Sequence, residues 1–164
     1  MDKAESVTDK AAVHLSTFLK KQGDNAEAHA LMAGVMGFQI SFSPMKGMWL
    51  GRKSNNHLDK AMNLGSDKPL VWHQSASSFY HKPATFGGDL DKAIEQFQES
   101  VKLYEQNKTD LSNNWAYLNT KTWLGIAYQK KGMKEQAVCT YDDILAQVPD
   151  FGWVKKVLKP KAEQ

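Results

Sequence analysis

The residues that could do chemistry in this chain include five histidines, and their spacing argues against a metal site. They are His14, His29, His57, His73 and His81. Imidazole is the commonest metal ligand and titrates near neutral pH, so metal binding and acid–base catalysis are the chemistries to consider. His73 and His81 could share one helix face, but they would be about 12 Å apart, too far for one zinc ion with ligands at about 2 Å. We therefore expect no metal site and ordinary surface or partly buried histidines.

A single cysteine and one glycine-rich turn are the other candidates. Cys139 has no second cysteine to pair with and no nearby histidine in sequence to activate its thiol, so neither a disulfide nor nucleophilic catalysis is expected. Gly87, Gly88 and Asp89 could form a phosphate-binding turn at the start of a helix. Because an aspartate at that position satisfies the backbone N–H groups itself and repels phosphate, we interpret it as a helix cap. We expect no cofactor and no enzymatic activity.

The length fits one domain, and the composition and charge favour neither a membrane span nor nucleic-acid binding. The chain has 164 residues, of which 41% are hydrophobic and 24% charged, enough to form a core without disulfides or metals. No segment approaches the roughly eighteen consecutive apolar residues of a membrane span. The net charge of +3 is dispersed, whereas nucleic-acid binders typically show a basic face interleaved with aromatic residues.

The amino terminus is polar and starts directly in a helical pattern, without the features of a secretory signal. The location stays undetermined from the sequence: taken as given, the chain would be cytoplasmic. A periplasmic or secreted protein is the alternative, if a signal peptide was removed before Met1.

The helices that must position any functional residue are indicated by an internal repeat, clearest over Leu118 to Phe151. Small residues fall where two helices of a hairpin must cross, larger ones around them, and a proline where the second helix must stop. The residues of this pattern are Leu124, Gly125, Tyr128, Gly132, Ala137, Tyr141 and Pro149.

This pattern resembles the tetratricopeptide repeat (TPR) family, whose unit is about 34 residues. The resemblance implies an all-α fold, a TPR-like right-handed superhelix of about three and a half helix pairs with a C-terminal capping helix. A first helix is predicted over Ala26 to Phe42, its partner over Asn55 to Gly65, and the next first helix from Pro69. The predicted units are a half repeat over 4–23, repeats over 24–66, 69–105 and 118–151, and a cap over 151–158.

Three segments exceed the family spacing, namely 43–51, 82–86 and 108–117, so an irregular superhelix is expected. The proline-containing segment before the Gly-Gly-Asp turn also resembles, more weakly, the periplasmic helical component of tripartite transporters. If the three insertions lie on one side of the stack, they would wall a pocket.

Large apolar residues in the insertions are the first candidate binding surface. Flexible Met and rigid Trp side chains are typical of binding surfaces when exposed. The alternative is that these segments fold back and cover the core, since large apolar side chains are usually buried. The residues concerned are Met45, Met48 and Trp49 in the first insertion, Phe86 in the second, and Trp115 and Tyr117 in the third.

The concave surface, lined by first helices in the TPR family, is the second candidate. The resemblance places Asn119, Thr122, Ile126, Gln129 and Lys130 there in the last repeat, and Leu70, His73 and Tyr80 in the middle one. Ala30 and Gly34 occupy the corresponding places of the first repeat, which argues against a peptide-carboxylate clamp of the kind some family members use.

The sequence thus predicts a non-catalytic scaffold that binds a protein or peptide through the concave surface and the insertions. The alternative is a carrier of a small apolar or amphipathic ligand in a pocket walled by the insertions. The candidate partner-binding residues are Phe38, Met45, Met48, Trp49, His73, Tyr80, Phe86, Asn119, Thr122, Gln129 and Lys130.

Overall fold

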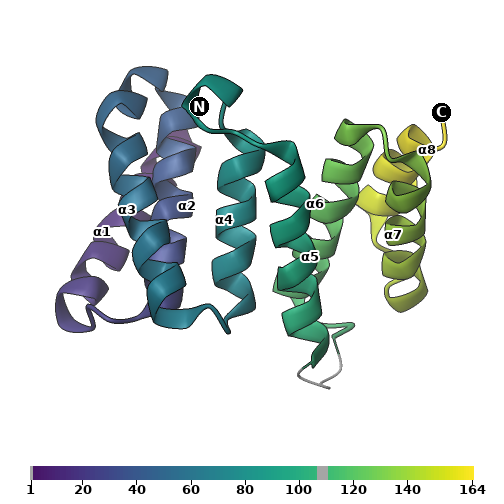
Figure 1. Cartoon of the computed structure of the whole chain (residues 1–164), viewed down its shortest axis with the longest axis horizontal. Coiled ribbons are helices and arrows are strands. Elements are labelled where there is room, and N and C mark those ends of the chain that lie inside the picture. Colours follow the sequence, from purple (N-terminus) through teal and green to yellow (C-terminus); the bar gives the residue numbers. More distant parts are fainter. Residues whose placement is uncertain (1, 107–110) are drawn as a thin grey trace. The chain divides into compact units, whose positions relative to one another are not determined.

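The computed structural model describes residues 2–106 and 111–164, and all the regular structure in these two ranges is helical. The elements are α1 (Asp2–Lys21), α2 (Ala26–Phe42), η1 (Pro44–Lys46), α3 (Gly47–Gly65), α4 (Pro69–His81), η2 (Ala84–Phe86), α5 (Leu90–Gln106), α6 (Trp115–Lys131), α7 (Lys134–Gln147), η3 (Val154–Leu158) and α8 (Lys159–Ala162) (Figure 1). The predicted all-α fold class is confirmed, and the helix predicted over Ala26 to Phe42 coincides with α2.

Short polar side chains begin three of these helices. Asn25 before α2 and Asn114 before α6 each accept a hydrogen bond from the backbone N–H three residues further on, at 2.8 and 3.1 Å. Asp89 accepts from the N–H groups of Asp91 and Lys92 at 3.0 and 3.1 Å at the start of α5. These bonds satisfy backbone donors that have no partner within the helix. The interpretation of Asp89 as a helix cap is confirmed.

The turn between α6 and α7 depends on Gly132. Its φ of 82° lies in the left-handed region that side chains disfavour, and its N–H donates to the carbonyl of Gln129 at 3.1 Å. The following N–H, of Met133, donates to Tyr128 O at 2.9 Å. The predicted turn at Gly132 is confirmed.

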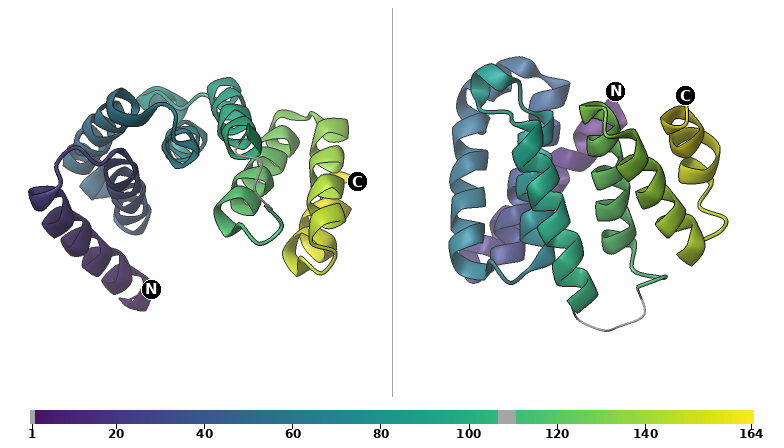
Figure 2. Two further views of the ribbon diagram at one scale, coloured as in Figure 1. Left: turned by 90° about the horizontal axis from the view of Figure 1, so that it is seen from below. Right: turned by 45° about the vertical axis from the view of Figure 1, so that its right-hand side comes forward.

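The chain forms two compact units, one ending at Ser78 and the other beginning at Phe79, so that their boundary lies within α4. In the first unit, α2 packs against both α1 and α3 (Figures 1 and 2). Its core is made largely of small side chains, which let the helix axes approach closely. The core residues are Ala26, Ala30, Ala61 and Val71, with Met62 packed against them.

Two histidines join α2 to α3 in this unit. The Nδ1 atoms of His29 and His57 are 2.7 Å apart, and His29 Nε2 lies 2.9 Å from the carbonyl oxygen of Gly23. Because a carbonyl only accepts, we assign a proton to His29 Nε2, which donates to Gly23 O, and the neutral form of His57 donates from Nδ1 in the tautomer that places its proton there. Burial, and then the charges of His29 and Lys60, lower the pKa of His57. The pair therefore favours the form in which His57 is neutral.

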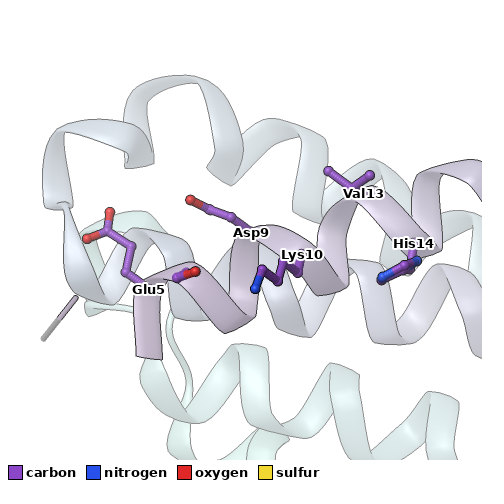
Figure 3. A pocket seen from close by; sticks show the side chains of 6 residues that line it. Glu5, Asp9, Lys10, Val13 and His14 are labelled. Carbon is purple, nitrogen blue, oxygen red and sulfur yellow. The ribbon is translucent and has the colours of Figure 1, made fainter. Parts of the chain in front are cut away.

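One face of α1 lies open to solvent. A shallow depression on it is lined by Glu5, Ser6, Asp9, Lys10, Val13 and His14 (Figure 3). All six residues belong to this one helix and all except Glu5 are exposed, so the depression is open surface rather than an enclosed cavity.

In the second unit, α6 packs against α5 on one side and α7 on the other, and α7 also contacts η3 and α8. The two helices α6 and α7 pack tightly at Gly125, where an added Cβ would lie 2.9 Å from Cζ of the Tyr141 ring. Ala137 and Tyr141 are both fully buried. The small and large residues predicted to build this seam therefore do so.

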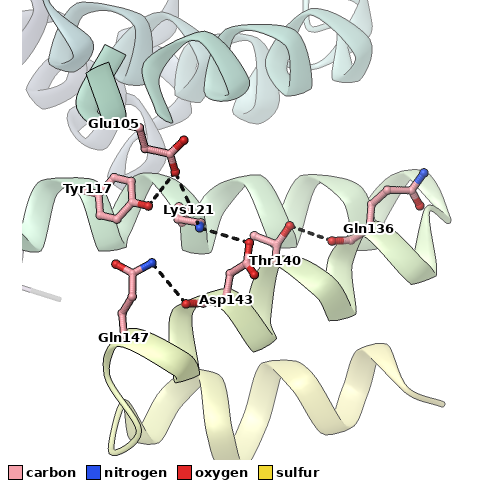
Figure 4. A network of polar contacts seen from close by, with 7 residues as sticks. All are labelled: Glu105, Tyr117, Lys121, Gln136, Thr140, Asp143 and Gln147. Atoms are coloured by element: carbon pink, nitrogen blue, oxygen red, sulfur yellow. Dashed lines mark hydrogen bonds and ion pairs between the residues drawn. The ribbon is translucent and has the colours of Figure 1, made fainter. Parts of the chain in front are cut away.

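A polar network joins the three central helices of this unit (Figure 4). The side chain of Lys121 is almost fully buried, and its ammonium group lies 3.4 Å from Asp143 and 3.9 Å from Glu105. The hydroxyl of Tyr117 donates to Glu105 at 2.8 Å, and Lys121 Nζ lies 5.6 Å from the centre of the Tyr117 ring. Lys121 thus joins α6 to α5 and α7 while its aliphatic part fills apolar space.

The first insertion, 43–51, is not the loop that the family spacing suggested. Pro44 begins η1, and α3 begins at Gly47 rather than near Asn55. Proline presets a helical φ at the first position of a helical turn, and α3 has α2 as a packing partner. The helix therefore extends through the extra residues.

The other insertions are also partly helical. The second forms η2, with Phe86 exposed. In the third, residues 108–110 lie outside the described residues, and Trp115 and Tyr117 already belong to α6. Trp115 is exposed, whereas Tyr117 is buried, so the expectation that Tyr117 belongs to an insertion loop is wrong.

The segment predicted as a cap over 151–158 is helical from Gly152 through Ala162. Its middle part, η3, is a wider π-helical turn in which Lys159 N–H donates to Val154 O. The following Pro160 has no N–H to donate, which is consistent with this local widening. Val154 is buried, whereas Trp153 is exposed. The repeat boundaries themselves stay a prediction.

Replacing Ala137 with Leu tests the seam between α6 and α7. Ala137 is fully buried. We expect Ala137→Leu to lower the free energy of unfolding by about 2 kcal/mol, because added methylene groups have no space at a helix crossing. Urea denaturation followed by circular dichroism measures the change. An unchanged midpoint would contradict the proposed packing.

Replacing Lys121 separates its charge from its packing. We expect Lys121→Met to stay within about 1 kcal/mol of the wild type, because Met fills the same space and the two carboxylates are themselves half exposed. Lys121→Ala should cost about 2 kcal/mol through lost packing. Equal losses for both variants in urea denaturation would show instead that the charge dominates.

Candidate functional site

Four large apolar side chains lie exposed at one end of the α2–α3 hairpin. Phe38 is in the final turns of α2, Met45 is in η1, and Met48 and Trp49 are in the first turn of α3. Their exposed fractions are 61%, 75%, 87% and 52%. We call these four residues the hairpin-end patch. Of the two alternatives for the first insertion, exposure rather than cover of the core therefore holds for Met45, Met48 and Trp49.

Local contacts hold the hairpin end in place. Lys46 Nζ forms an ion pair with Glu5 of α1 at 3.0 Å, and both side chains are partly buried. The N–H of Ser43 donates to Gln39 O at 3.2 Å where α2 ends. The patch residues thus lie on two helices and on the turn between them, which the Lys46–Glu5 ion pair fixes to α1. Their side chains therefore project from an ordered backbone.

A second group of residues gathers in the second unit. Tyr80 and His81 at the end of α4 both contact Trp123 of α6 edge-on, with ring centroids 5.4 and 5.1 Å away. The ammonium group of Lys130 lies 4.2 Å from the centre of the Tyr80 ring and 3.5 Å from the Tyr80 carbonyl oxygen. We call these four residues the ring–lysine cluster. It is a cation beside three aromatic rings.

The electrostatics of this cluster follow from its partial burial. Burial, and then the charge of Lys130, lower the pKa of His81, so His81 is neutral near pH 7. Burial raises the pKa of the Tyr80 hydroxyl. Burial also raises the pKa of Tyr141, with a smaller contribution from Tyr80. Lys130 is therefore the positive group of this cluster at neutral pH.

Two predicted binding residues are turned into the protein. Thr122 is fully buried, and its hydroxyl donates to Leu118 O at 2.7 Å within α6. His73 is also buried, and burial lowers its pKa to about 4. The expectation that these two side chains face a partner is therefore wrong in this structure, because packing covers the side of each helix on which they lie.

The remaining predicted residues are at least partly accessible. Asn119 and Gln129 are half-buried on α6, and Phe86 on η2 is exposed. Of the predicted set, Tyr80 and Lys130 are brought together, and Phe38 lies at the same end of the α2–α3 hairpin as the three residues of the first insertion. A binding role for any of them stays a prediction.

Sequence reasoning missed Trp123 and His81. Trp123 follows Thr122 directly in the sequence. The predicted binding position on α6 was therefore wrong by one residue: Thr122 is buried, whereas Trp123 is partly exposed. The size of the tryptophan was a signal, since large aromatic side chains dominate binding surfaces. His81 lacked any local signal, because its neighbours in space come from another helix.

Among the side chains that the structure describes, no set of metal ligands is brought together. Within residues 2–106 and 111–164, no group of three or more His, Cys, Asp or Glu side chains is placed to hold a metal ion. Cys139 is exposed on α7, where it is one of six residues, all of that helix, that line an open depression. Among the described helices, none is long and apolar enough to cross a membrane.

Comparisons with known proteins agree with this architecture. No family model matches the chain, and no curated protein matches it. Its structure is similar to the crystal structure of MamA protein, with a TM-score of 0.56 over 98% of this chain and 80% of that chain. The fold is TPR-like. At 16% sequence identity, the likeness concerns the fold alone and is consistent with an α-solenoid.

Proposed function

We propose that the chain is a non-catalytic scaffold that binds another polypeptide, with the hairpin-end patch as its main contact. The observation that carries this proposal is the exposure of Phe38, Met45, Met48 and Trp49 at one end of a single hairpin. Exposed apolar side chains are ordinary when they are scattered, but contiguous ones mark interaction sites.

The composition of the patch favours a polypeptide partner. Tryptophan provides a large rigid surface that often supplies much of the binding energy at interfaces. Methionine adapts to irregular partner surfaces because its side chain is flexible and polarizable. A patch with Met48 and Trp49 in adjacent positions combines both properties, and the TPR-like fold supports the same function class.

A carrier of a small apolar ligand is less well supported. Such a ligand needs a concave pocket that buries most of its surface. The two depressions described on α1 and α7 are each lined by residues of one helix. Neither offers the enclosing walls that a carrier requires, so we favour the polypeptide.

The test compares partner binding by the wild type and a patch variant, Met48→Ser combined with Trp49→Ser. Affinity capture from the source organism identifies a polypeptide, and titration calorimetry with that purified polypeptide measures its dissociation constant. We expect the variant to bind at least about tenfold more weakly, because truncating a central anchor costs more than about 1.4 kcal/mol.

A matched control is Leu64→Ser on the same helix α3. Leu64 is also an exposed large apolar residue, but it lies at the opposite end of α3 from Trp49. The Leu64→Ser variant should bind the partner as tightly as the wild type. Equal binding by the patch variant and the wild type would overturn the proposal, and a co-purifying lipid-like mass in native mass spectrometry would favour the carrier.

A further inference from the structure

We infer that the ring–lysine cluster, Tyr80, His81, Trp123 and Lys130, is a subsite for the carboxylate of an acidic residue in the bound polypeptide, with an apolar neighbour of that residue against the rings. This inference rests on the proposed scaffold function and adds the chemistry of the partner. It concerns the second unit, whereas the hairpin-end patch belongs to the first.

The charge of the cluster is uncompensated. Lys130 is exposed, and its ammonium group has no carboxylate within ion-pair distance in the part of the chain that the structure describes; its hydrogen bond is to a backbone carbonyl at 3.5 Å. In contrast, neighbouring Lys131 is paired with Asp91 at 2.7 Å. An ammonium group has three donors, so Lys130 keeps donors for an incoming anion.

The rings add a second donor and an apolar wall. The indole N–H of Trp123 makes no hydrogen bond to any described residue, although Trp123 is half-buried and its ring contacts those of both Tyr80 and His81. Because indole can only donate, the hydrogen-bonding capacity of Trp123 is satisfied by an acceptor such as a carboxylate oxygen. Lys130 and Trp123 lie on the same helix, α6, and both contact Tyr80. We expect a carboxylate to pair with the Lys130 ammonium group, with the Trp123 N–H as a further donor beside Tyr80, while an adjacent apolar side chain covers the ring edges.

A nucleic acid fits this surface less well. Backbone phosphates are bound by a continuous track of free cations, and bases need open ring faces on which to stack. Here Lys131 is neutralised by Asp91, and the rings pack edge to face against one another, with Lys130 over the Tyr80 face. Lys130 is thus the cation of this cluster that is open to a ligand, and a single carboxylate is the anion that fits it.

The test uses two capped peptides that differ in one charge, acetyl-Ala-Leu-Glu-Leu-Ala-amide and its Gln counterpart. The indole N–H resonance of Trp123, assigned by its loss in Trp123→Phe, is followed by ¹⁵N NMR of the whole chain. We expect the Glu peptide to shift this resonance and to bind about tenfold more tightly than the Gln peptide, as a charge-assisted hydrogen bond would give. The difference should shrink as salt is raised.

Variants locate the charge recognition. Lys130→Met should abolish the preference for the Glu peptide, while Lys131→Met, the matched control on the next residue, should keep it. Circular dichroism and thermal unfolding establish that both variants remain folded.

The outcomes separate this inference from the proposed function. No shift of Trp123, equal binding of the two peptides, or an unchanged preference in Lys130→Met would overturn the inference. A larger Trp123 response to a short oligothymidylate than to the Glu peptide would overturn it in favour of nucleic acid. The effect of the hairpin-end variant on partner binding is measured separately by calorimetry. The proposed function can therefore be correct even if the peptide experiment overturns the carboxylate subsite.

Discussion

Replacing Gly125 with Leu should destabilise the protein by about 4 kcal/mol, the largest loss we expect from one substitution. A Cβ added at Gly125 would lie 2.9 Å from Cζ and 3.0 Å from Cδ1 of Tyr141, and closer still to Cε1. The Tyr141 ring is fully buried and cannot move into solvent. A four-carbon side chain would therefore push α6 away from α7, and a loss at the upper end of what overpacking costs is expected because the ring it meets has no space to move into. Urea denaturation measures the change.

Gly37 provides the matched control. It is also a helical glycine, but it is exposed on α2 and an added Cβ would meet nothing within 4 Å. Gly37→Leu should leave stability unchanged or raise it by less than about 1 kcal/mol, because leucine is a better helix former. Similar losses at both positions would show that the glycines matter for another reason than the crossing.

The role of the Tyr141 ring can be isolated with the smaller substitution Gly125→Ala. We expect it to cost about 2 kcal/mol in the wild type. In a Tyr141→Leu background the same substitution should cost clearly less, since the ring atoms that it meets are gone. A strictly additive double mutant would refute this contact as the cause.

Lowering the pH from 6.5 to 4 should destabilise the first unit by about 3 kcal/mol through His73 alone. Burial lowers the pKa of His73 to about 4 in the folded protein, against an ordinary value near 6.5. Between these values the unfolded chain binds a proton that the folded chain does not. The stabilising effect of neutral His73 is thus complete above about pH 6.5 and is lost as the pH falls towards 4. His57, whose pKa is also lowered, acts in the same direction.

Substitution assigns this pH dependence to one residue. His73→Gln cannot titrate, so its free energy of unfolding, measured by urea denaturation across this pH range, should fall less steeply than that of the wild type. His14→Gln, at an exposed position on α1, controls for the loss of a histidine as such. The same slope in His73→Gln and in the wild type would disprove the assignment.

The sequence predicted the last hairpin well because its signals are local. Gly132 is at the left-handed turn, and Ala137 and Tyr141 are fully buried beside Gly125, as the spacing implied. Asp89 caps α5 for a similar reason, since a cap bonds to N–H groups two and three residues away. Such features depend only on residues a few positions apart in the sequence and on the crossing of one pair of neighbouring helices.

The sequence was less informative about surfaces. It identified Met45, Met48 and Trp49 as apolar residues in excess of the repeat, but left open whether they cover the core. It placed Thr122 and His73 at a binding surface, where the structure buries both. With about 3.6 residues per helical turn, neighbouring side chains point about 100° apart around the helix axis. An error of one residue in the alignment therefore assigns a side chain to the wrong face of the helix.

By itself, the sequence determined that this chain is helical, that α6 and α7 must pair around Gly125, and where their turn lies. Only the tertiary structure decided that α3 extends through the first insertion, that His29 meets His57, and that Lys130 lies over Tyr80. The physical reason is that helix formation and capping are satisfied within a few residues. The exposure of a side chain and the charge beside it depend instead on which other helix packs there, and that helix can lie tens of residues away in the sequence.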